Sequence, residues 1–292
     1  MEHRSNPGIV LNKIVLHAVL ILVSLICILP LVVIISASFS SEKALTDYGY
    51  SLLPHEFSLE AYRFLFHQPD QMVRSYGVTI FVTVVGTLVS LLLTSLLAYP
   101  LSRKDFASRR WISLYVLFTM LFNGGLVPTY MVVSRVFHLK DSIWALILPY
   151  LIIAWFVFLM RTFFSTIPDE IIESAKMDGM GEYRLYVQII VPLSTPVLAT
   201  IGLFCALNYW NDWYLALLYI DSRELAPLQY LLMTVMKNIE VINSSANATT
   251  ALIPSDTVRM ATAVLAIGPV IFVYLFFQKY FVRGLTVGAV KG

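Results

Sequence analysis

The chain has 292 residues, of which 58% are hydrophobic and 13% charged, and its mean hydropathy is +0.77. This composition is typical of an integral membrane protein and excludes an ordinary soluble domain. The net charge of +2 is too small to favour nucleic acid as a partner. Cys27 and Cys205 lie inside apolar runs, so they predict neither a disulfide framework nor a metal site.

Six apolar runs are long enough to cross a bilayer, which takes roughly 20 residues in a helix. They cover about 14–38, 75–100, 111–133, 142–164, 196–218 and 260–281. The first run is too long for the apolar part of a signal peptide, so we interpret it as an uncleaved span. Gly124 and Gly125 predict a bend in the third run. The sequence therefore predicts an all-α membrane protein with six transmembrane helices.

This count divides the chain into three parts. We expect residues 1–74 to form the first span and an outer segment, residues 75–281 to form a core with five spans, and residues 282–292 to form a tail. An even number of spans puts both termini on one side of the membrane. The loop 103–110 holds four basic residues but only one acid, Asp105, which by the positive-inside rule predicts that both termini are cytoplasmic.

Residues 168–192 are a polar interruption between the fourth and fifth runs. Pro168 followed by Asp169 and Glu170, after the hydroxyl of Thr166, indicates a capped helix start with acids at its positive end. Gly179 is expected to end this helix, and a second helix is expected to run from Gly181 to Pro192. On the first helix an apolar face is predicted. Its members are Ile171, Ile172 and Ala175.

Acids outnumber bases in this helix–glycine–helix segment, which the charge of the 103–110 loop predicts to be cytoplasmic. The acids are Asp169, Glu170, Glu173, Asp178 and Glu182, and the bases are Lys176 and Arg184. Such a charge run is usually just a solvated connection. A compact acidic projection between two spans also suits docking into a basic cleft of another protein.

The spacing within this segment resembles a family signature. Glu173-Ser174-Ala175 is followed at fixed distances by Gly179, Ile189 and Val191-Pro192. The signature of binding-protein-dependent ABC importer permeases is Glu-Ala-Ala, three residues, glycine, nine residues, then Ile-x-Leu-Pro. Ser174 and Val191 are the departures. The resemblance implies a coupling helix that sits in a groove of an ATPase subunit, with Glu173 as the charged contact. The residues assigned to coupling are Glu173, Ala175, Asp178, Gly179, Gly181 and Pro192.

Further stretches are similar to carbohydrate permeases of this family. Residues 122–130, Phe-Asn-Gly-Gly-Leu-Val-Pro-Thr-Tyr, look like the LplC/YtcP-type subgroup, which is linked to complex and acidic oligosaccharides. The last nine residues resemble the tail of MalG-like permeases, which enters the ATPase dimer interface. The resemblance therefore implies a MetI-like fold and assigns Gly288, Lys291 and Gly292 to that interface.

The outer segment 219–259 contains leucines at helical spacing, so we expect part of it to be a helix at the membrane surface. Its polar tip runs from Asn243 to Thr250. In the resembling family the loop before the last span reaches into the sugar site of the binding protein. That role is assigned here to Asn243, Ser244, Ser245 and Asn247.

A sugar path needs aromatic faces together with planar amides and carboxylates. Candidates lie in the third and fifth runs. They are Asn123, Tyr130, Asn208, Trp210, Asn211 and Asp212. An ionisable residue in a span usually has a function, but Asp212 lies near the end of its run and an inter-helix cap is an equal alternative.

The chain has no G-x-x-x-x-G-K-[ST] sequence to hold ATP phosphates, and its five histidines show no metal-ligand spacing. We therefore expect no enzyme activity, cofactor or metal on this chain, with ATP and Mg²⁺ on a partner. The hypothesis is a permease of an oligosaccharide importer in the bacterial cytoplasmic membrane. Its expected partners are a similar second permease, two ATPase subunits, an external solute-binding protein, the oligosaccharide and membrane lipid.

Two alternatives remain at this point. An ion-coupled secondary transporter acting alone needs ionisable residues at mid-membrane, and apart from Asp212 the spans hold almost none. A structural membrane protein does not need the glycine turn.

Overall fold

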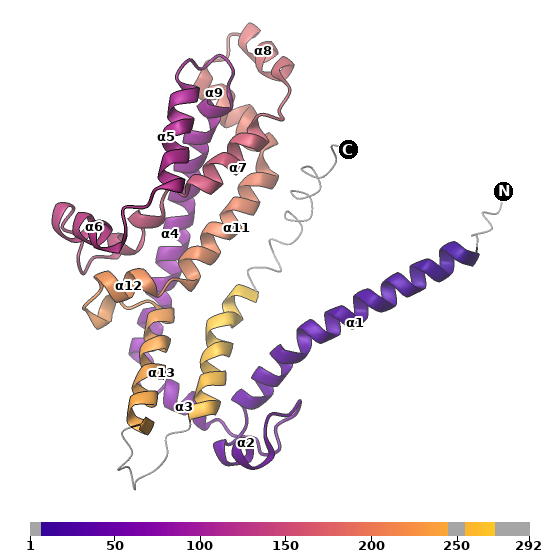
Figure 1. The fold of residues 1–292 in the computed structure, drawn as a ribbon, viewed down its shortest axis with the longest axis vertical. Helices are drawn as coiled ribbons and strands as arrows, with labels where there is room; N and C mark the ends of the chain where they lie inside the picture. Colours follow the sequence, from indigo (N-terminus) through magenta and orange to yellow (C-terminus); the bar gives the residue numbers. More distant parts are fainter. Residues whose placement is uncertain (1–6, 245–254, 272–292) are drawn as a thin grey trace. The chain divides into compact units, whose positions relative to one another are not determined.

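A computed structural model describes residues 7–244 and 255–271. Within these ranges the regular structure is helical, and no strand is found beyond a single bridge between Ser40 and Phe57 (Figure 1). The described residues divide into two compact units. The first contains 7–68 and the described part of Val235–Gly268, and the second contains Pro69–Thr234 and 269–271.

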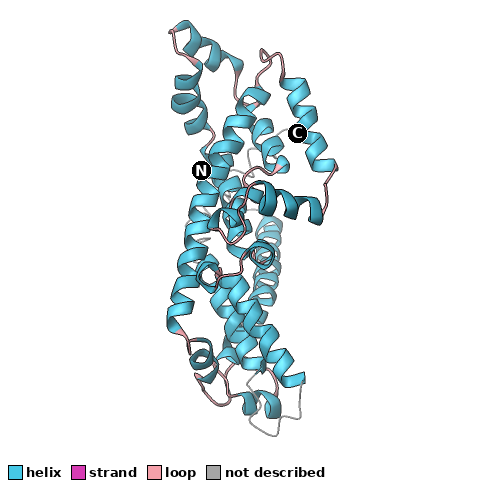
Figure 2. Ribbon diagram, turned by 90° about the vertical axis from the view of Figure 1, so that its left-hand side faces the viewer, coloured by secondary structure: helices cyan, strands magenta, loops and turns pink. Residues whose placement is uncertain are grey.

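The helices occur in the following order (Figures 1 and 2). They are α1 (Pro7–Ser38), α2 (Glu42–Tyr48), α3 (Glu60–Leu65), α4 (Pro69–Ser102), α5 (Arg109–Leu121), α6 (Leu126–Met131), η1 (Val132–Val136), η2 (Ile143–Leu146), η3 (Leu148–Tyr150), α7 (Ala154–Phe164), α8 (Asp169–Met177), α9 (Glu182–Leu185), η4 (Tyr186–Ile190), α10 (Val191–Leu193), α11 (Thr195–Asn211), α12 (Tyr214–Tyr219), η5 (Arg223–Leu225) and α13 (Leu228–Ser244). A further helix covers 255–271.

Two straight helices are long and apolar enough to cross a membrane, Asn12–Ser38 within α1 and Pro69–Ser102, which is α4. Three bent pairs also qualify, which gives up to five spans among the described residues. The pairs are α5 with 126–136, 143–150 with α7, and 182–193 with α11. The predicted sixth span, 260–281, is described only up to residue 271, where it belongs to the helix 255–271.

The bends lie where the sequence interrupts the helix. The expected bend in the third run is confirmed, because the chain turns by 111° between α5 and 126–136, and Gly125 has φ +89°. The prediction of a single helix for the fourth run is wrong. Its first half forms the short 3₁₀ turns η2 and η3, with Pro149 in η3, and a 50° bend precedes α7.

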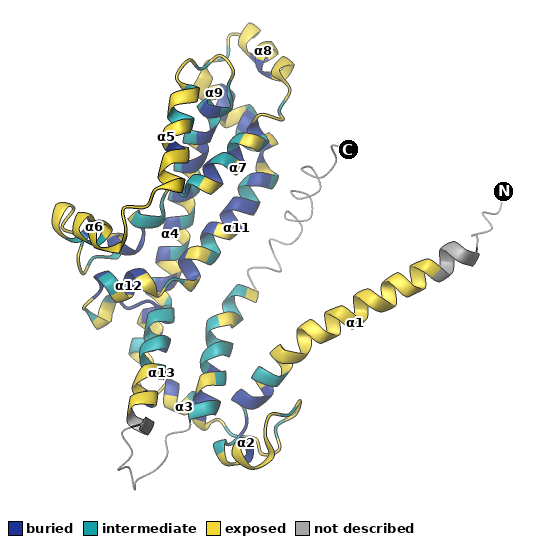
Figure 3. Cartoon of the chain, in the orientation of Figure 1, coloured by how far each residue is buried: buried dark blue, intermediate teal, exposed yellow. Residues whose placement is uncertain are grey.

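In the first unit, most of α1 from residue 12 onward is exposed (Figure 3), and its exposed large apolar side chains run from Ile14 to Ile35. A helix that is hydrophobic all round is typical of a membrane span. The carboxylate of Glu42 in α2 accepts hydrogen bonds from the backbone amides of Ser255, Asp256 and Thr257, each at 3.0 Å, and from the Thr257 hydroxyl at 2.7 Å. Glu42 therefore caps the start of the helix 255–271. Burial raises the pKa of Glu42, but these hydrogen bonds outweigh it and the net shift is downward.

In the second unit, α4 is the central helix and packs against α7 and α11. Its buried face is built mainly from small residues at helical spacing, an arrangement that lets membrane helices approach closely. These include Ser75, Thr79, Gly86, Ser90, Thr94 and Ala98. The closest approach is at Gly86, where an added Cβ atom would lie 2.6 Å from the ring of Tyr209 on α11. The Tyr209 hydroxyl lies 3.0 Å from the Ser90 hydroxyl and donates to the Ile147 carbonyl at 3.0 Å.

Candidate functional site

The helix–glycine–helix segment predicted at 168–192 is confirmed. Helix α8 ends at Met177, and Gly179 has φ +77°, a left-handed conformation that glycine adopts most easily. The amide of Gly179 donates to the Lys176 carbonyl and the amide of Met180 to the Ala175 carbonyl, both at 3.0 Å. This pair of hydrogen bonds is a Schellman turn, which satisfies the last carbonyls of the helix.

The second arm begins at Glu182, after Gly181 in the N-cap position, and continues through α9, a π turn at η4 and α10, which contains Pro192. The chain then bends by 80° into α11. The predicted capping role of Thr166 is wrong. Its hydroxyl donates to the Phe163 carbonyl at 2.7 Å and so closes α7, while Pro168 stands at the N-cap of α8 without a side-chain cap.

The apolar face of α8 consists of Ile172 and Ala175, which are 4% and 5% exposed. They belong to one core cluster with Leu185 and Ile190 of the second arm. Ile171, which the sequence placed on the same face, is 39% exposed. Each residue turns the helix by about 100°, so Ile171 lies beside the face rather than on it. The two arms and the ends of α4 and α7 thus share one hydrophobic core.

Ion pairs connect α8 and α9 to the loop that follows α4. Lys104 binds Asp169 at 2.8 Å. Asp105 binds Arg103 at 3.0 Å and Lys176 at 3.3 Å, and Lys176 also binds Glu182 at 2.6 Å. We call these six side chains the hairpin network. The hydrogen bond from Arg103 is the main cause that lowers the pKa of Asp105 to about 2.

Glu182 and Lys176 stabilise each other's charged forms. The hydrogen bond from Lys176 lowers the pKa of Glu182, and the same hydrogen bond raises the pKa of Lys176. Tyr99 at the end of α4 also donates to Glu182 at 2.8 Å. Two of the five acids of the segment, Asp169 and Glu182, are therefore neutralised within the protein.

The remaining acids are presented outward. Glu170, Glu173 and Asp178 are exposed, and none of the three has an ion pair or side-chain hydrogen bond within the described part of the chain. Asp178 stands at the C-cap of α8, where its backbone amide bonds the Ser174 carbonyl. Two large side chains next to them are also exposed, Met177 at 83% and Tyr183 at 77%. The outer surface of the hairpin thus combines unpaired acids with uncovered apolar area, and Figure 3 shows that much of α8 is exposed.

The candidates for a sugar path in the third run take part in local contacts. Asn123 accepts a hydrogen bond from the Gly125 amide at 2.9 Å and so belongs to the turn between α5 and α6. The ring of Tyr130 stacks on the ring of Tyr219 with centroids 5.6 Å apart.

The candidates in the fifth run are grouped at the end of α11. Asp212 accepts from the Tyr150 hydroxyl and from the Leu215 amide, both at 3.2 Å, so it ties the start of α12 to η3. Asn211 donates to the Leu207 carbonyl of its own helix at 2.9 Å. Trp210 is buried and Asn208 is exposed. These contacts favour the capping alternative for Asp212.

Two sets of candidates fall largely outside the described residues. Ser245, Asn247, Gly288, Lys291 and Gly292 are among them. Asn243 and Ser244 form the last turn of α13. The helix predicted in the outer segment is confirmed as α13, with Leu228 and Leu232 buried.

Sequence reasoning missed the contact between Gly86 and Tyr209. The signal was available, since small residues recur at every third or fourth position of α4. It also missed that the loop 103–110, besides setting the orientation, holds α8 through Lys104 and Asp105.

Residues 8–287 match the family described as binding-protein-dependent transport system inner membrane component. The chain therefore belongs to this family, and it is the membrane permease of a binding-protein-dependent ABC importer. Such a permease works with ATPase subunits, a solute-binding protein and a second permease, and ATP hydrolysis takes place on the separate ATPase subunits. This membership sets aside the ion-coupled carrier and the structural protein.

Individual relatives are similar in sequence over nearly the whole chain. It is 40% identical over 288 residues to the polygalacturonan/rhamnogalacturonan transport system permease protein YtcP of Bacillus subtilis strain 168, covering 97% of this chain and 99% of that one. It is 41% identical over 272 residues to protein LplC of the same organism, covering 92% and 91%.

The fold is also similar to a chain in the crystal structure of a bacterial ABC transporter involved in the import of the acidic polysaccharide alginate. The TM-score is 0.78 with 31% identity, over 96% of this chain and 100% of that chain. The MetI-like helical permease fold predicted from the sequence is confirmed.

Proposed function

We propose that this permease imports acidic, uronate-containing oligosaccharides and that the hairpin 168–192 is where it receives force from its ATPase. The coupling role is supported by a contrast within the hairpin. Its inner side is held to the rest of the protein, whereas its outer surface carries acids that have no partner among the described residues. The hairpin network and the shared core fix the hairpin to α4 and α7, while Glu173, Met177 and Tyr183 stay uncovered. In this proposal the hairpin faces the cytoplasm, as do both termini.

The mechanism follows from how the hairpin is built. Ile172 and Ala175 are buried with the ends of α4, α7 and α11, so a displacement of α8 must displace those helices as well. Gly179 allows the tight return of the chain at the contact surface. Glu173 forms the charged contact with a basic residue of the ATPase. When ATP closes the ATPase dimer, the hairpins of the two permeases approach each other and the spans change between outward and inward openings.

The substrate class is supported by the relatives. The name of YtcP refers to polygalacturonan and rhamnogalacturonan, and the transporter of similar fold imports alginate. We propose Asn208, Trp210 and Asn211 on α11, with Asn123 and Tyr130, as the part of the path that this subunit contributes, and Asp212 as the cap that ties α12 to η3. The loop with Asn243, Ser244, Ser245 and Asn247 is proposed to enter the binding protein. The tail with Gly288, Lys291 and Gly292 is proposed to enter the ATPase interface.

The coupling proposal is tested in the complete complex reconstituted with two ATPase subunits, the second permease and the binding protein. Glu173→Ala and Gly179→Asp are expected to leave the complex assembled but to separate ATP hydrolysis from uptake, with a loss of transport of roughly tenfold or more, on the order of one charged contact. Glu224→Ala is the matched control, because Glu224 is an exposed glutamate whose only described ion pair is with Arg74. Normal substrate-stimulated ATPase activity and uptake in both hairpin variants would overturn the assignment.

The substrate class is tested separately on the unmodified complex. ATPase stimulation is measured with the cognate binding protein and a series of oligogalacturonates, oligoalginates and neutral oligosaccharides of equal length. Stimulation by uronate oligomers alone is expected. Stimulation by the neutral series alone would reject the acidic substrate but leave the coupling proposal intact.

A further inference from the structure

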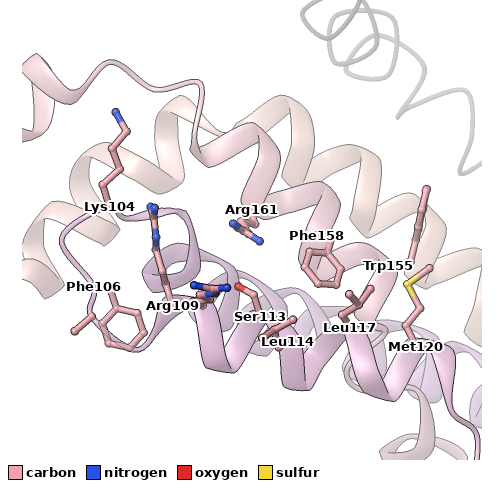
Figure 4. Close-up of a pocket in the computed structure, with 12 residues that line it drawn as sticks. Lys104, Phe106, Arg109, Ser113, Leu114, Leu117, Met120, Trp155, Phe158 and Arg161 are labelled. Atoms are coloured by element: carbon pink, nitrogen blue, oxygen red, sulfur yellow. The ribbon is translucent and has the colours of Figure 1, made fainter.

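A groove of about 670 Å³ lies between α5 and α7 (Figure 4). One end is lined by basic side chains and the rest by apolar ones. Its lining consists of Lys104, Phe106, Ala107, Arg109, Arg110, Ser113, Leu114, Leu117, Met120, Trp155, Phe158 and Arg161. We call it the α5–α7 groove. No acidic residue is among its lining residues.

The basic end holds more positive charge than the protein itself neutralises. Lys104 is paired with Asp169. Arg109, Arg110 and Arg161, in contrast, have no carboxylate partner among the residues that the structure describes. Arg109 donates weakly to the Arg103 carbonyl at 3.4 Å, and the Arg161 guanidinium lies 6.0 Å from the centre of the Phe158 ring.

A polar group sits among these arginines and also has no partner. The Ser113 hydroxyl is buried at the basic end of the groove, and no hydrogen bond to it is found within the described residues. In Figure 4 the hydroxyl and the guanidinium groups gather at one end of the groove, with Arg161 reaching in from α7 and Arg109 from α5. Together they provide donors for the oxygens of a single anionic group.

Taken together, the basic end and the apolar wall of the groove have about the length of one bilayer leaflet. Arg109 and Met120 are eleven residues apart on α5, which is roughly 16 Å at 1.5 Å per residue. Half of a hydrocarbon core of about 30 Å is about 15 Å. Trp155, which is 59% exposed, lies opposite Met120 at the far end of this wall (Figure 4).

We propose that the α5–α7 groove binds an anionic glycerophospholipid, with its phosphate among Arg109, Arg161 and Ser113 and one acyl chain along Leu117 and Met120. The chemistry requires both parts, because a free phosphate would leave the apolar wall of Leu114, Leu117 and Met120 uncovered. An apolar helix of a partner subunit, for its part, leaves the arginines uncompensated. Basic pockets between transmembrane helices on the cytoplasmic side suit such headgroups. The assignment of this lipid to the cytoplasmic leaflet rests on the orientation proposed above. The argument from the arginines and the apolar wall does not depend on that orientation.

The test uses the complete complex in vesicles of dioleoylphosphatidylcholine with a tenth of dioleoylphosphatidylglycerol. Native mass spectrometry after gentle extraction counts the phosphatidylglycerol retained. Arg109→Gln with Arg161→Gln is expected to weaken retention of one lipid by about 25-fold, since each basic group near a headgroup contributes roughly fivefold. The double variant Arg109→Lys with Arg161→Lys keeps the charge and is expected to keep most of the binding. Arg135→Gln is the control, because Arg135 is exposed on η1 outside the groove.

A photo-crosslinking residue in place of Leu117 identifies the occupant directly. Crosslinking to phosphatidylglycerol that disappears in the glutamine double variant supports the proposal. Equal phosphatidylglycerol retention by the original and glutamine complexes, or a crosslink to the second permease in place of lipid, would overturn it. Neither readout depends on ATPase coupling, so the result stands apart from the test of the hairpin.

Discussion

The seam between α4 and α11 and the hairpin 168–192 hold helices together in opposite ways. At the seam, Gly86 and Ser90 let the ring of Tyr209 lie against the backbone of α4, and all the groups involved are neutral and buried. At the hairpin, the contacts to the preceding loop are ion pairs between side chains that are mostly more than a third exposed, such as Lys104 with Asp169. Shape determines the first contact, whereas charge and a glycine turn determine the second.

This difference predicts that the two regions respond differently to substitution. A seam inside the membrane has no water to replace lost contacts, so it is expected to move as a rigid unit. Ion pairs in water are individually weak, so the hairpin network holds the base of the hairpin through several contacts together rather than through any single one. The difference can be examined by changing one glycine in each region.

The largest effect is expected at the seam. Gly86→Ala places a methyl group 2.6–2.9 Å from three ring atoms of Tyr209, and that ring is held by hydrogen bonds to Ser90 and Ile147. Overpacking of this kind costs about 1–3 kcal/mol. The free energy of unfolding in detergent, measured by denaturant titration of the purified complex, is expected to fall by that amount.

The matched control is on the same helix. A Cβ atom added at Gly77 would meet no other atom within 4 Å, so Gly77→Ala is expected to be neutral or slightly stabilising. Equal stability of the Gly86→Ala and Gly77→Ala complexes would mean that α4 and α11 are not packed this closely.

A smaller effect is expected from the glycine of the hairpin. Gly179 has open space around it, so only its φ of +77° resists substitution, and Gly179→Ser is expected to cost about 1 kcal/mol. Hydrogen exchange of the α8 amides is expected to quicken about fivefold. Gly179→Asn is expected to lose less, because asparagine tolerates the left-handed region.

Gly181 supplies the comparison for this change. It also has open space, but its φ is −73° and it stands at an N-cap, a position that serine favours. Gly181→Ser is therefore expected to leave exchange in α8 unchanged. Faster exchange in both serine variants would indicate that the hairpin responds to any added side chain rather than to the backbone angle.

The hairpin could be predicted well from the sequence because the residues that determine its helices and its turn are close together in the chain. A proline with two acids, a glycine and a fixed spacing are sufficient to define two short helices and the turn between them. The same locality explains the error at Thr166, since a hydroxyl between two helices can close the first or cap the second, and hydrophobicity does not distinguish these outcomes.

The seam and the hairpin network were not predicted, because their members are distant in the chain. Gly86 and Tyr209 meet across more than a hundred residues, and Asp105 meets Lys176 across 71. The apolar runs predict where the spans lie but contain no pairing information. The bends at Gly125 and at the 3₁₀ turns before α7 further alter which faces meet.

The smallest effect concerns pH, and only the hairpin is expected to show it. The pKa of Asp105 is lowered to about 2 by Arg103, and those of Asp169 and Glu182 are lowered by Lys104 and Lys176. Because the folded pKa values lie below those of the unfolded chain, their contribution to stability is complete above about pH 5. It is lost as the pH falls through the folded values towards 2. These carboxylates are largely exposed and screened by water, so the contribution of each one is small.

Exchange of the α8 amides, corrected for the intrinsic effect of pH, is therefore expected to quicken slightly between about pH 5 and pH 3. The triple variant Asp105→Asn, Asp169→Asn, Glu182→Gln is expected to lose this dependence. Amides of α4 around Gly86 and Ser90 serve as the control in the same sample, because no carboxylate takes part in the described contacts of the seam. A pH response of equal size in both regions would show that acid acts on the whole protein, and the hairpin network would then not be an independent tether of the hairpin.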